Sequence, residues 1–100
     1  MIKHIVFFKL KNNFTREEKN IKLMELKNRL DALKDKIPQV ILFETGVNIS
    51  QSANAFDLSL VSEFENLEKL EEYRKHPDHE SVLDFINEIK EDVAVVDYEF

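Results

Sequence analysis

The sequence predicts an α+β fold of the ferredoxin-like type, a four-stranded antiparallel sheet with both helices on one face. The 100-residue chain alternates between β-rich and amphipathic helical segments in the order β-α-β-β-α-β. No linker or low-complexity tract interrupts this order, so we expect a single domain over residues 1–100. Right-handed crossovers would then place the strands in the order fourth, first, third, second.

The first strand and the first helix follow from residue type. Residues 2–10 are rich in β-branched and aromatic side chains, which is typical of a strand. Thr15 and Glu18 have the spacing of a capping box and open a helix that Pro38 ends. The apolar stripe of this helix is predicted at Leu23, Leu26, Leu30, Leu33 and Ile37, widened by Ile21 and Met24.

The second half of the chain repeats the alternation. Three further strands are predicted at residues 40–47, 56–64 and 93–100, with a polar loop at 48–54. Asn66 can cap a second helix, and Pro77 divides that helix from its continuation. The apolar stripes of these two parts are Leu67, Leu70 and Tyr73, followed by Val82, Phe85, Ile86 and Ile89.

The predicted strands carry apolar side chains on both faces. In the first strand Val6 and Phe8 alternate with Ile5 and Phe7, and the second and fourth strands have the same character. Two helices cover one face only, and soluble monomers rarely expose so large an apolar patch. Burying even ~600 Å² per subunit outweighs most costs of association. We therefore expect an obligate homodimer that forms a barrel through the open sheet face. The alternative is a monomer with loops folded over that face.

Composition excludes several classes of protein. Twenty acidic and fourteen basic residues give a net charge of −6, which disfavours nucleic acid as a partner. Without cysteine there can be no disulfide and no thiolate-bound metal, and the single Gly46 cannot build a glycine-rich phosphate loop. Residues 1–10 are too short and too rich in lysine for a membrane span. We expect a cytoplasmic protein with no membrane partner and no cofactor.

Several segments resemble the stress-responsive A/B barrel (Dabb) family. They are residues 1–6, 37–38, 46–50, 56–58, 64–65, 73–79 and 96–98. The most specific of them is the Tyr-x-x-His-Pro-x-His pattern at 73–79. The resemblance implies the same plait and a dimeric α+β barrel, but no single function. Some plant members are stress-stable proteins, and one closes a polyketide ring by aldol condensation.

The pattern of that cyclase implies three candidate catalytic residues in this chain. Tyr73 corresponds to the oxyanion donor, His79 to the base and His4 to a histidine of the pocket. An aldol closure needs such a base and such a donor. Where the cyclase has a further strand histidine this chain has Asp57, and we expect Asp57 to face His4 across neighbouring strands. The pocket or supporting residues predicted with them are Val6, Phe8 and His76.

Each candidate also has a purely structural interpretation. Tyr73 completes an apolar stripe, so its ring can belong to the core. His76 and His79 flank the proline at the helix break, where histidines often bind backbone groups of helix ends. His4 and Asp57 could form a buried structural pair. The same proline disturbs the helical spacing that His76 and His79 would need to bind zinc, so we expect no metal.

Two classes of function follow. The first is a non-catalytic homodimer that binds a small apolar or aromatic molecule or acts in a stress response through its stability. The second is a cofactor-independent cyclase or lyase that uses the base and donor above; a cofactor-free monooxygenase has no specific support. An open pocket between helices and sheet favours the enzyme, whereas a space filled by Val6, Phe8, Leu26 and Leu83 argues against catalysis.

Overall fold

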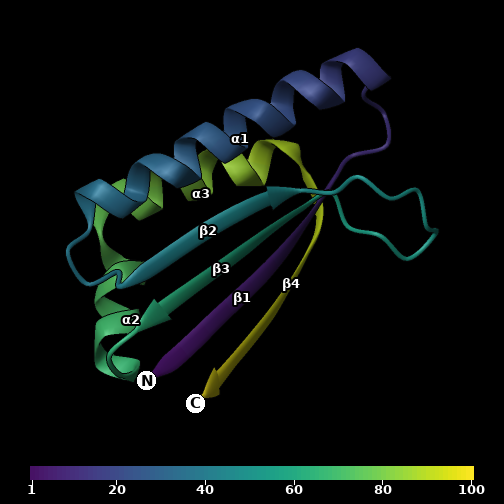
Figure 1. Ribbon diagram of the computed structural model, residues 1–100. Coiled ribbons are helices and arrows are strands. Elements are labelled where there is room, and N and C mark those ends of the chain that lie inside the picture. The colour runs from purple at the N-terminus through teal and green to yellow at the C-terminus, as the bar shows by residue number, and fades with distance from the viewer.

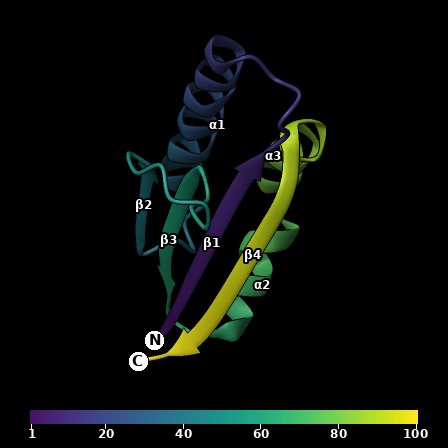
Figure 2. The same ribbon diagram turned by 90° about the vertical axis from the view of Figure 1, so that its right-hand side faces the viewer.

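The computed structural model describes residues 1–100 and has the predicted order of elements. These are β1 (Ile2–Leu10), α1 (Arg16–Lys36), β2 (Leu42–Val47), β3 (Leu58–Phe64), α2 (Leu67–Lys75), α3 (Pro77–Ile89) and β4 (Lys90–Glu99). The helices lie on one side of the sheet, with α1 beside β2 and also against α3 (Figure 1). From the β4 side, α2 and α3 are seen behind β1 and β4 (Figure 2).

The sheet has the strand order β2-β3-β1-β4, and every neighbouring pair is antiparallel. This confirms the predicted order. β1 is therefore central, and its register places Ser62 of β3 on one side of His4 and Asp97 of β4 on the other. β2 and β4 are the edges of the sheet.

The strands start at different residues from those predicted. β2 begins at Leu42 rather than at residue 40, because the amide of Val40 is bonded in a turn to the carbonyl of Ile37. β3 begins at Leu58 rather than at residue 56. β4 begins three residues early, at Lys90, because α3 runs into it without a loop.

The capping box predicted for α1 is present. The Thr15 hydroxyl accepts a hydrogen bond from the amide of Glu18 at 3.1 Å, and the Glu18 carboxylate accepts one from the amide of Thr15 at 3.0 Å. These two bonds satisfy donors that the first turn of a helix leaves free. At the other end Ile37 is the C-cap, directly before Pro38.

The core lies between the helices and the inner face of the sheet. It contains the predicted stripe of α1, the inner side chains of β1 and β3, and the apolar faces of α2 and α3. The prediction that Ile21 and Met24 widen the stripe is wrong, since they are 59% and 50% exposed and line an open groove between α1 and α3. Leu67 is also exposed, at the first residue of α2.

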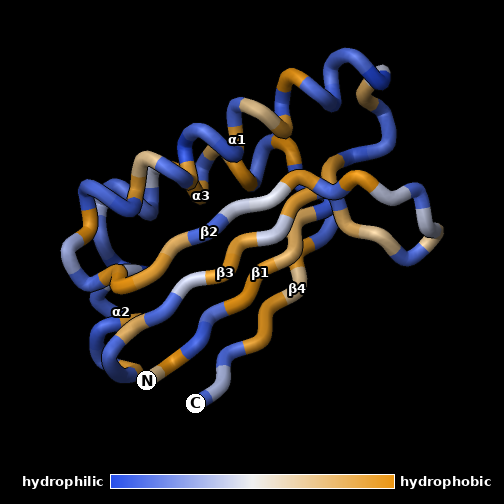
Figure 3. The backbone as a smooth tube through the Cα atoms, in the orientation of Figure 1, coloured by the Kyte–Doolittle hydropathy of each residue, from blue (hydrophilic) through white to orange (hydrophobic).

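The outer face of the sheet is not covered by any helix and carries apolar side chains. Phe7 and Val96 are 43% and 58% exposed, and Leu42 and Tyr98 are exposed on the same face. Figure 3 shows hydrophobic stretches along all four strands. The two-sided apolar pattern inferred from the sequence is therefore present. None of the helices has the length and apolar character needed to cross a bilayer.

Candidate functional site

A sharp break between α2 and α3 brings Tyr73 and His79 together. His76 ends α2 and also caps α3, where its Nδ1 accepts a hydrogen bond from the amide of Asp78 at 3.1 Å. Pro77 occupies the first turn of α3, a position that suits its fixed backbone angle. The turn leaves the rings of Tyr73 and His79 with centroids 4.5 Å apart. His76 thus has the structural role of a helix cap.

His79 has one ring nitrogen engaged and one free. Its Nδ1 lies 3.1 Å from the carbonyl oxygen of Arg74, and because a carbonyl only accepts, Nδ1 carries the proton of a neutral ring. Burial lowers the pKa of His79, and the hydrogen bond to the Arg74 carbonyl opposes this effect. The neighbouring side chains of His4 and Arg74 lower the pKa further. The neutral ring therefore presents Nε2 as an acceptor or a base.

Tyr73 is fully buried, yet its hydroxyl has no hydrogen-bond partner. Its ring also packs against Phe64 and Phe43. Burial raises the pKa of Tyr73, with the charge of Arg74 opposing it weakly, so the hydroxyl stays protonated at neutral pH. Buried hydroxyls are normally satisfied, so this orphaned one requires an explanation.

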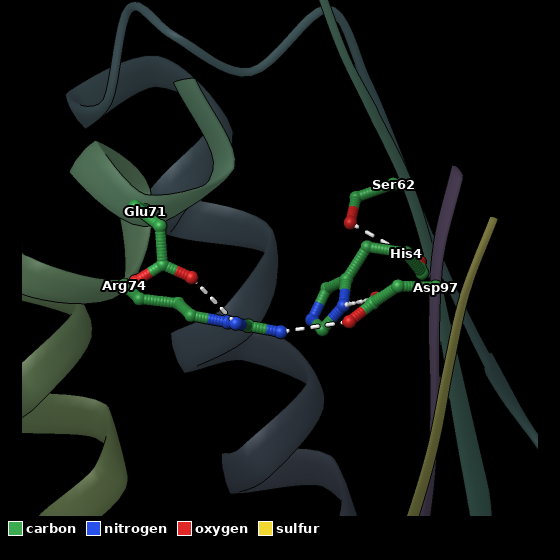
Figure 4. A network of polar contacts seen from close by, with 5 residues as sticks. All are labelled: His4, Ser62, Glu71, Arg74 and Asp97. Atoms are coloured by element: carbon green, nitrogen blue, oxygen red, sulfur yellow. Dashed lines mark hydrogen bonds and ion pairs between the residues drawn. The ribbon is translucent and has the colours of Figure 1, made fainter. Parts of the chain in front are cut away.

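His4 belongs to a chain of polar contacts that links the sheet to α2 (Figure 4). Its Nδ1 bonds the Asp97 carboxylate, whose other oxygen accepts from Nη2 of Arg74 at 2.8 Å. Nη1 of Arg74 in turn donates to Glu71 at 2.7 Å. Ser62 donates from β3 to the backbone carbonyl of His4 at 3.3 Å. The His4 ring is buried, and these contacts hold it with its centroid 6.3 Å from the centroid of the Tyr73 ring.

The predicted contact between His4 and Asp57 is wrong. Asp57 lies before the start of β3, at the opposite end of β1 from His4. Its carboxylate accepts from the amide of Leu10 at 2.8 Å and pairs with Lys19 at 3.1 Å. It therefore fastens the ends of β1 and α1 together, and the carboxylate that meets His4 comes from β4. Sequence reasoning missed Asp97 and Arg74, although both lie in segments that resemble the family.

The three candidate residues line one cavity between the helices and the sheet. It has a volume of about 320 Å³ and takes in His4, Tyr73 and His79, with Arg74 beside them. Much of the remaining wall is apolar, including Val6, Phe8, Leu60, Val82, Leu83 and Ile86. Two larger hollows, between α1 and α3 and beside the 48–57 loop, contain no histidine or tyrosine. The space predicted to discriminate between the functions is therefore open: Val6, Phe8 and Leu83 line it without filling it, and Leu26 belongs to the core elsewhere.

This arrangement can bind and polarise a small molecule. The wall of the cavity includes Tyr73 and the neutral imidazole of His79, and most of its other residues are apolar. A carbonyl oxygen could accept from Tyr73 while a proton on a neighbouring carbon faces His79. No three or more histidine, aspartate or glutamate side chains converge in an arrangement suited to a metal ion.

Comparison with known proteins agrees with this fold. A family model described as the stress responsive A/B barrel domain matches residues 2–100. The Streptomyces coelicolor protein SCO4036 is 30% identical over the full length of both chains. A crystal structure of a dimeric protein of unknown function from Bacteroides fragilis, with a ferredoxin-like fold, is 37% identical. It has a TM-score of 0.90, and the match covers 99% of this chain and 95% of that one.

A more distant structure has the same fold with a known activity in its name. The hydroxynitrile lyase from Passiflora edulis is 16% identical, with a TM-score of 0.80 over 97% of this chain and 90% of the lyase. At this identity the likeness concerns the fold alone.

Proposed function

The chain belongs to the stress responsive A/B barrel family, and we propose that it is a homodimer that binds a small, mostly apolar carbonyl compound in the cavity beside Tyr73. The observation that carries this proposal is the unpartnered, fully buried hydroxyl of Tyr73, a residue that lines a mostly apolar cavity. A hydroxyl buried without a partner costs free energy, and a ligand acceptor would remove that cost.

The dimer is supported by the uncovered apolar face of the sheet. Phe7, Leu42, Val96 and Tyr98 lie there together, and a second copy packed sheet to sheet would cover all of them at once. The Bacteroides fragilis relative is described as dimeric. The cavity lies on the other face, between sheet and helices, so dimerisation leaves it accessible.

The binding proposal is tested with two ketones, acetophenone and heptan-2-one, titrated into the wild-type protein and followed by NMR. We expect Tyr73→Phe to weaken binding about three- to tenfold, the effect of one lost hydrogen bond. Tyr98→Phe is the matched control, because Tyr98 lies on the outer face, away from the cavity. Equal affinities in wild type and Tyr73→Phe, or no binding of either ketone, would overturn the proposal.

A second candidate function is proton transfer, as in a cofactor-independent lyase or cyclase of the aldol type. It is favoured by the 4.5 Å separation of the Tyr73 and His79 rings and by the lowered pKa of His79. In this step Nε2 of His79 removes a proton from the carbon next to the carbonyl, and the electron pair moves onto the carbonyl oxygen. The Tyr73 hydroxyl then bonds the negative oxygen. The enolate formed could attack a second carbonyl, or receive the proton back.

This second function predicts exchange of the methyl hydrogens of acetophenone with deuterium in D₂O, faster with protein than without. His79→Gln should abolish the acceleration, since an amide is no base at neutral pH. Arg29→Gln is the control, because Arg29 lies on α1 and does not line the cavity. Ketone binding without accelerated exchange would leave the protein a binding module.

A further inference from the structure

We propose that Arg74 is a positioning residue for both histidines of the cavity, acting on His79 through its backbone and on His4 through Asp97. The inference rests on the proposed function, because it concerns how the same cavity is prepared for a ligand. Arg74 lies in the last turn of α2, directly after Tyr73, and itself lines the cavity.

The backbone of Arg74 sets the orientation of His79. Its carbonyl belongs to the end of α2, where the following break leaves carbonyl groups without helical partners. Nδ1 of His79 donates to it at 3.1 Å. This bond places the proton of the neutral ring on Nδ1 and leaves Nε2 for the cavity. Because the contact is to the backbone, it does not depend on the identity of the side chain at position 74.

The side chain of Arg74 sets the orientation of His4. Its guanidinium bridges Glu71 of its own helix and Asp97 of β4, so the Asp97 carboxylate is held from α2 as well as from the sheet (Figure 4). The Asp97 oxygen opposite that bridge accepts from Nδ1 of His4. A carboxylate so held fixes which ring nitrogen carries the proton, as in other carboxylate–histidine pairs. Nε2 of His4 is then the nitrogen without a protein partner.

Both histidines are thus bonded to protein at Nδ1 and leave Nε2 unengaged, and both rings are neighbours of the Tyr73 ring. One arginine connects the two histidines: its main-chain carbonyl accepts from His79, and its side chain holds the Asp97 carboxylate that binds His4. Replacing the Arg74 side chain should therefore release His4 while His79 stays in place. A general loss of structure would affect both histidines, so a change at His4 alone identifies positioning by the Arg74 side chain.

The experiment is long-range ¹H–¹⁵N NMR of the imidazole rings in the ligand-free protein, at a pH where histidines are neutral. In the wild type we expect both His4 and His79 as the Nδ1–H tautomer. In Arg74→Gln we expect His4 to lose that signature and to populate the Nε2–H tautomer, while His79 keeps it. Asp97→Ala should have the same effect on His4, and Arg74→Lys should restore it in part.

The matched control is Arg29→Gln, since Arg29 also pairs with a glutamate of its own helix, Glu25, but lies outside the cavity. It should leave both tautomers unchanged. The inference is overturned if wild-type His4 is the Nε2–H tautomer, or if Arg74→Gln leaves His4 unaltered or changes both histidines alike. Because no ligand is used, a failure of the ketone titration does not affect this result.

Discussion

Burial acts on the two central residues of the cavity in opposite chemical directions. It disfavours the anion of Tyr73 and so raises its pKa, and it disfavours the cation of His79 and so lowers its pKa. Both side chains are therefore neutral near pH 7, one as a donor and the other as an acceptor. The same low polarity that keeps the cavity apolar thus maintains the protonation states that it needs.

The lowered pKa of His79 predicts a loss of stability in mild acid. Between the pKa of His79 in the native state and its value near 6.5 when unfolded, the unfolded chain binds more protons. The free energy of unfolding should therefore fall as the pH drops through about 6.5, by at most about 1.4 kcal/mol per pH unit for this one group. Urea unfolding at several pH values should give a shallower slope for His79→Gln than for wild type. Arg29→Gln, outside the cavity, should keep the wild-type slope, and an unchanged slope in His79→Gln would contradict the prediction.

The orphaned hydroxyl of Tyr73 predicts a gain in stability when it is removed. Tyr73→Phe keeps the ring in the core and deletes a buried polar atom that has no partner. We expect the free energy of unfolding to rise by up to about 1 kcal/mol in urea titrations, the reverse of the usual effect of a core substitution. Tyr98→Phe removes a hydroxyl on the outer face, away from the core, and should change the free energy of unfolding little. A marked loss of stability in Tyr73→Phe would mean that the hydroxyl has a structural role.

At the scale of the elements, local sequence signals define the helix ends that position the site. Thr15 and Glu18 start α1, and His76 with Pro77 separates α2 from α3. Without His76 and Pro77 the α2 helix would continue, and Tyr73 and His79 would lie at the spacing of an unbroken helix rather than with ring centroids 4.5 Å apart. The cavity thus depends on a break that is encoded in adjacent residues.

The N-terminal cap of α1 contributes measurably to the free energy of unfolding. Thr15→Ala removes the side-chain half of the capping box and should lower the free energy of unfolding by about 1 kcal/mol. Thr15→Ser is the matched variant, because it keeps the hydroxyl, and it should remain close to wild type. Chemical denaturation of the three proteins side by side checks this, and equal losses in both variants would assign the effect to packing of the methyl group.

The types of the elements could be predicted because hydrophobic period, caps and prolines act locally, and the sheet order followed from right-handed crossovers. The Tyr73–His79 pair was predicted only through the resemblance to the family. The partner of His4 could not be predicted, because it depends on strand register. β4 starts at Lys90 with an irregularity near Leu10, and nothing in the sequence of β4 indicates that Asp97 comes level with His4. The burial of Ile21 was also wrongly predicted, because apolar spacing alone does not distinguish a helix position in the core from one that lines an open groove.

At the scale of the whole molecule, the sheet separates two tasks. Its inner face forms the core and the cavity, and its outer face has apolar side chains that none of the helices covers. Substitutions on the outer face should therefore change assembly while leaving the cavity intact.

The outer face predicts how the assembly can be broken. Phe7→Glu would place a charge among the exposed apolar residues near its centre, and burying it unpaired would be costly. Sedimentation should give a particle of twice 11.8 kDa for wild type and one near 11.8 kDa for Phe7→Glu. Met24→Glu, at an exposed site on α1, is the control and should stay dimeric. A wild type that sediments as a single chain would contradict the dimer.

The composition of the β4 edge has a further consequence. A ten-residue edge strand, paired with β1 on one side only, is a template on which other chains can polymerise. This one begins with Lys90, Glu91 and Asp92 and ends near Asp97 and Glu99, so an incoming strand would meet charges at either end. Pairing through the broad faces leaves that rim in water, where these charges protect the molecule from growing into fibres.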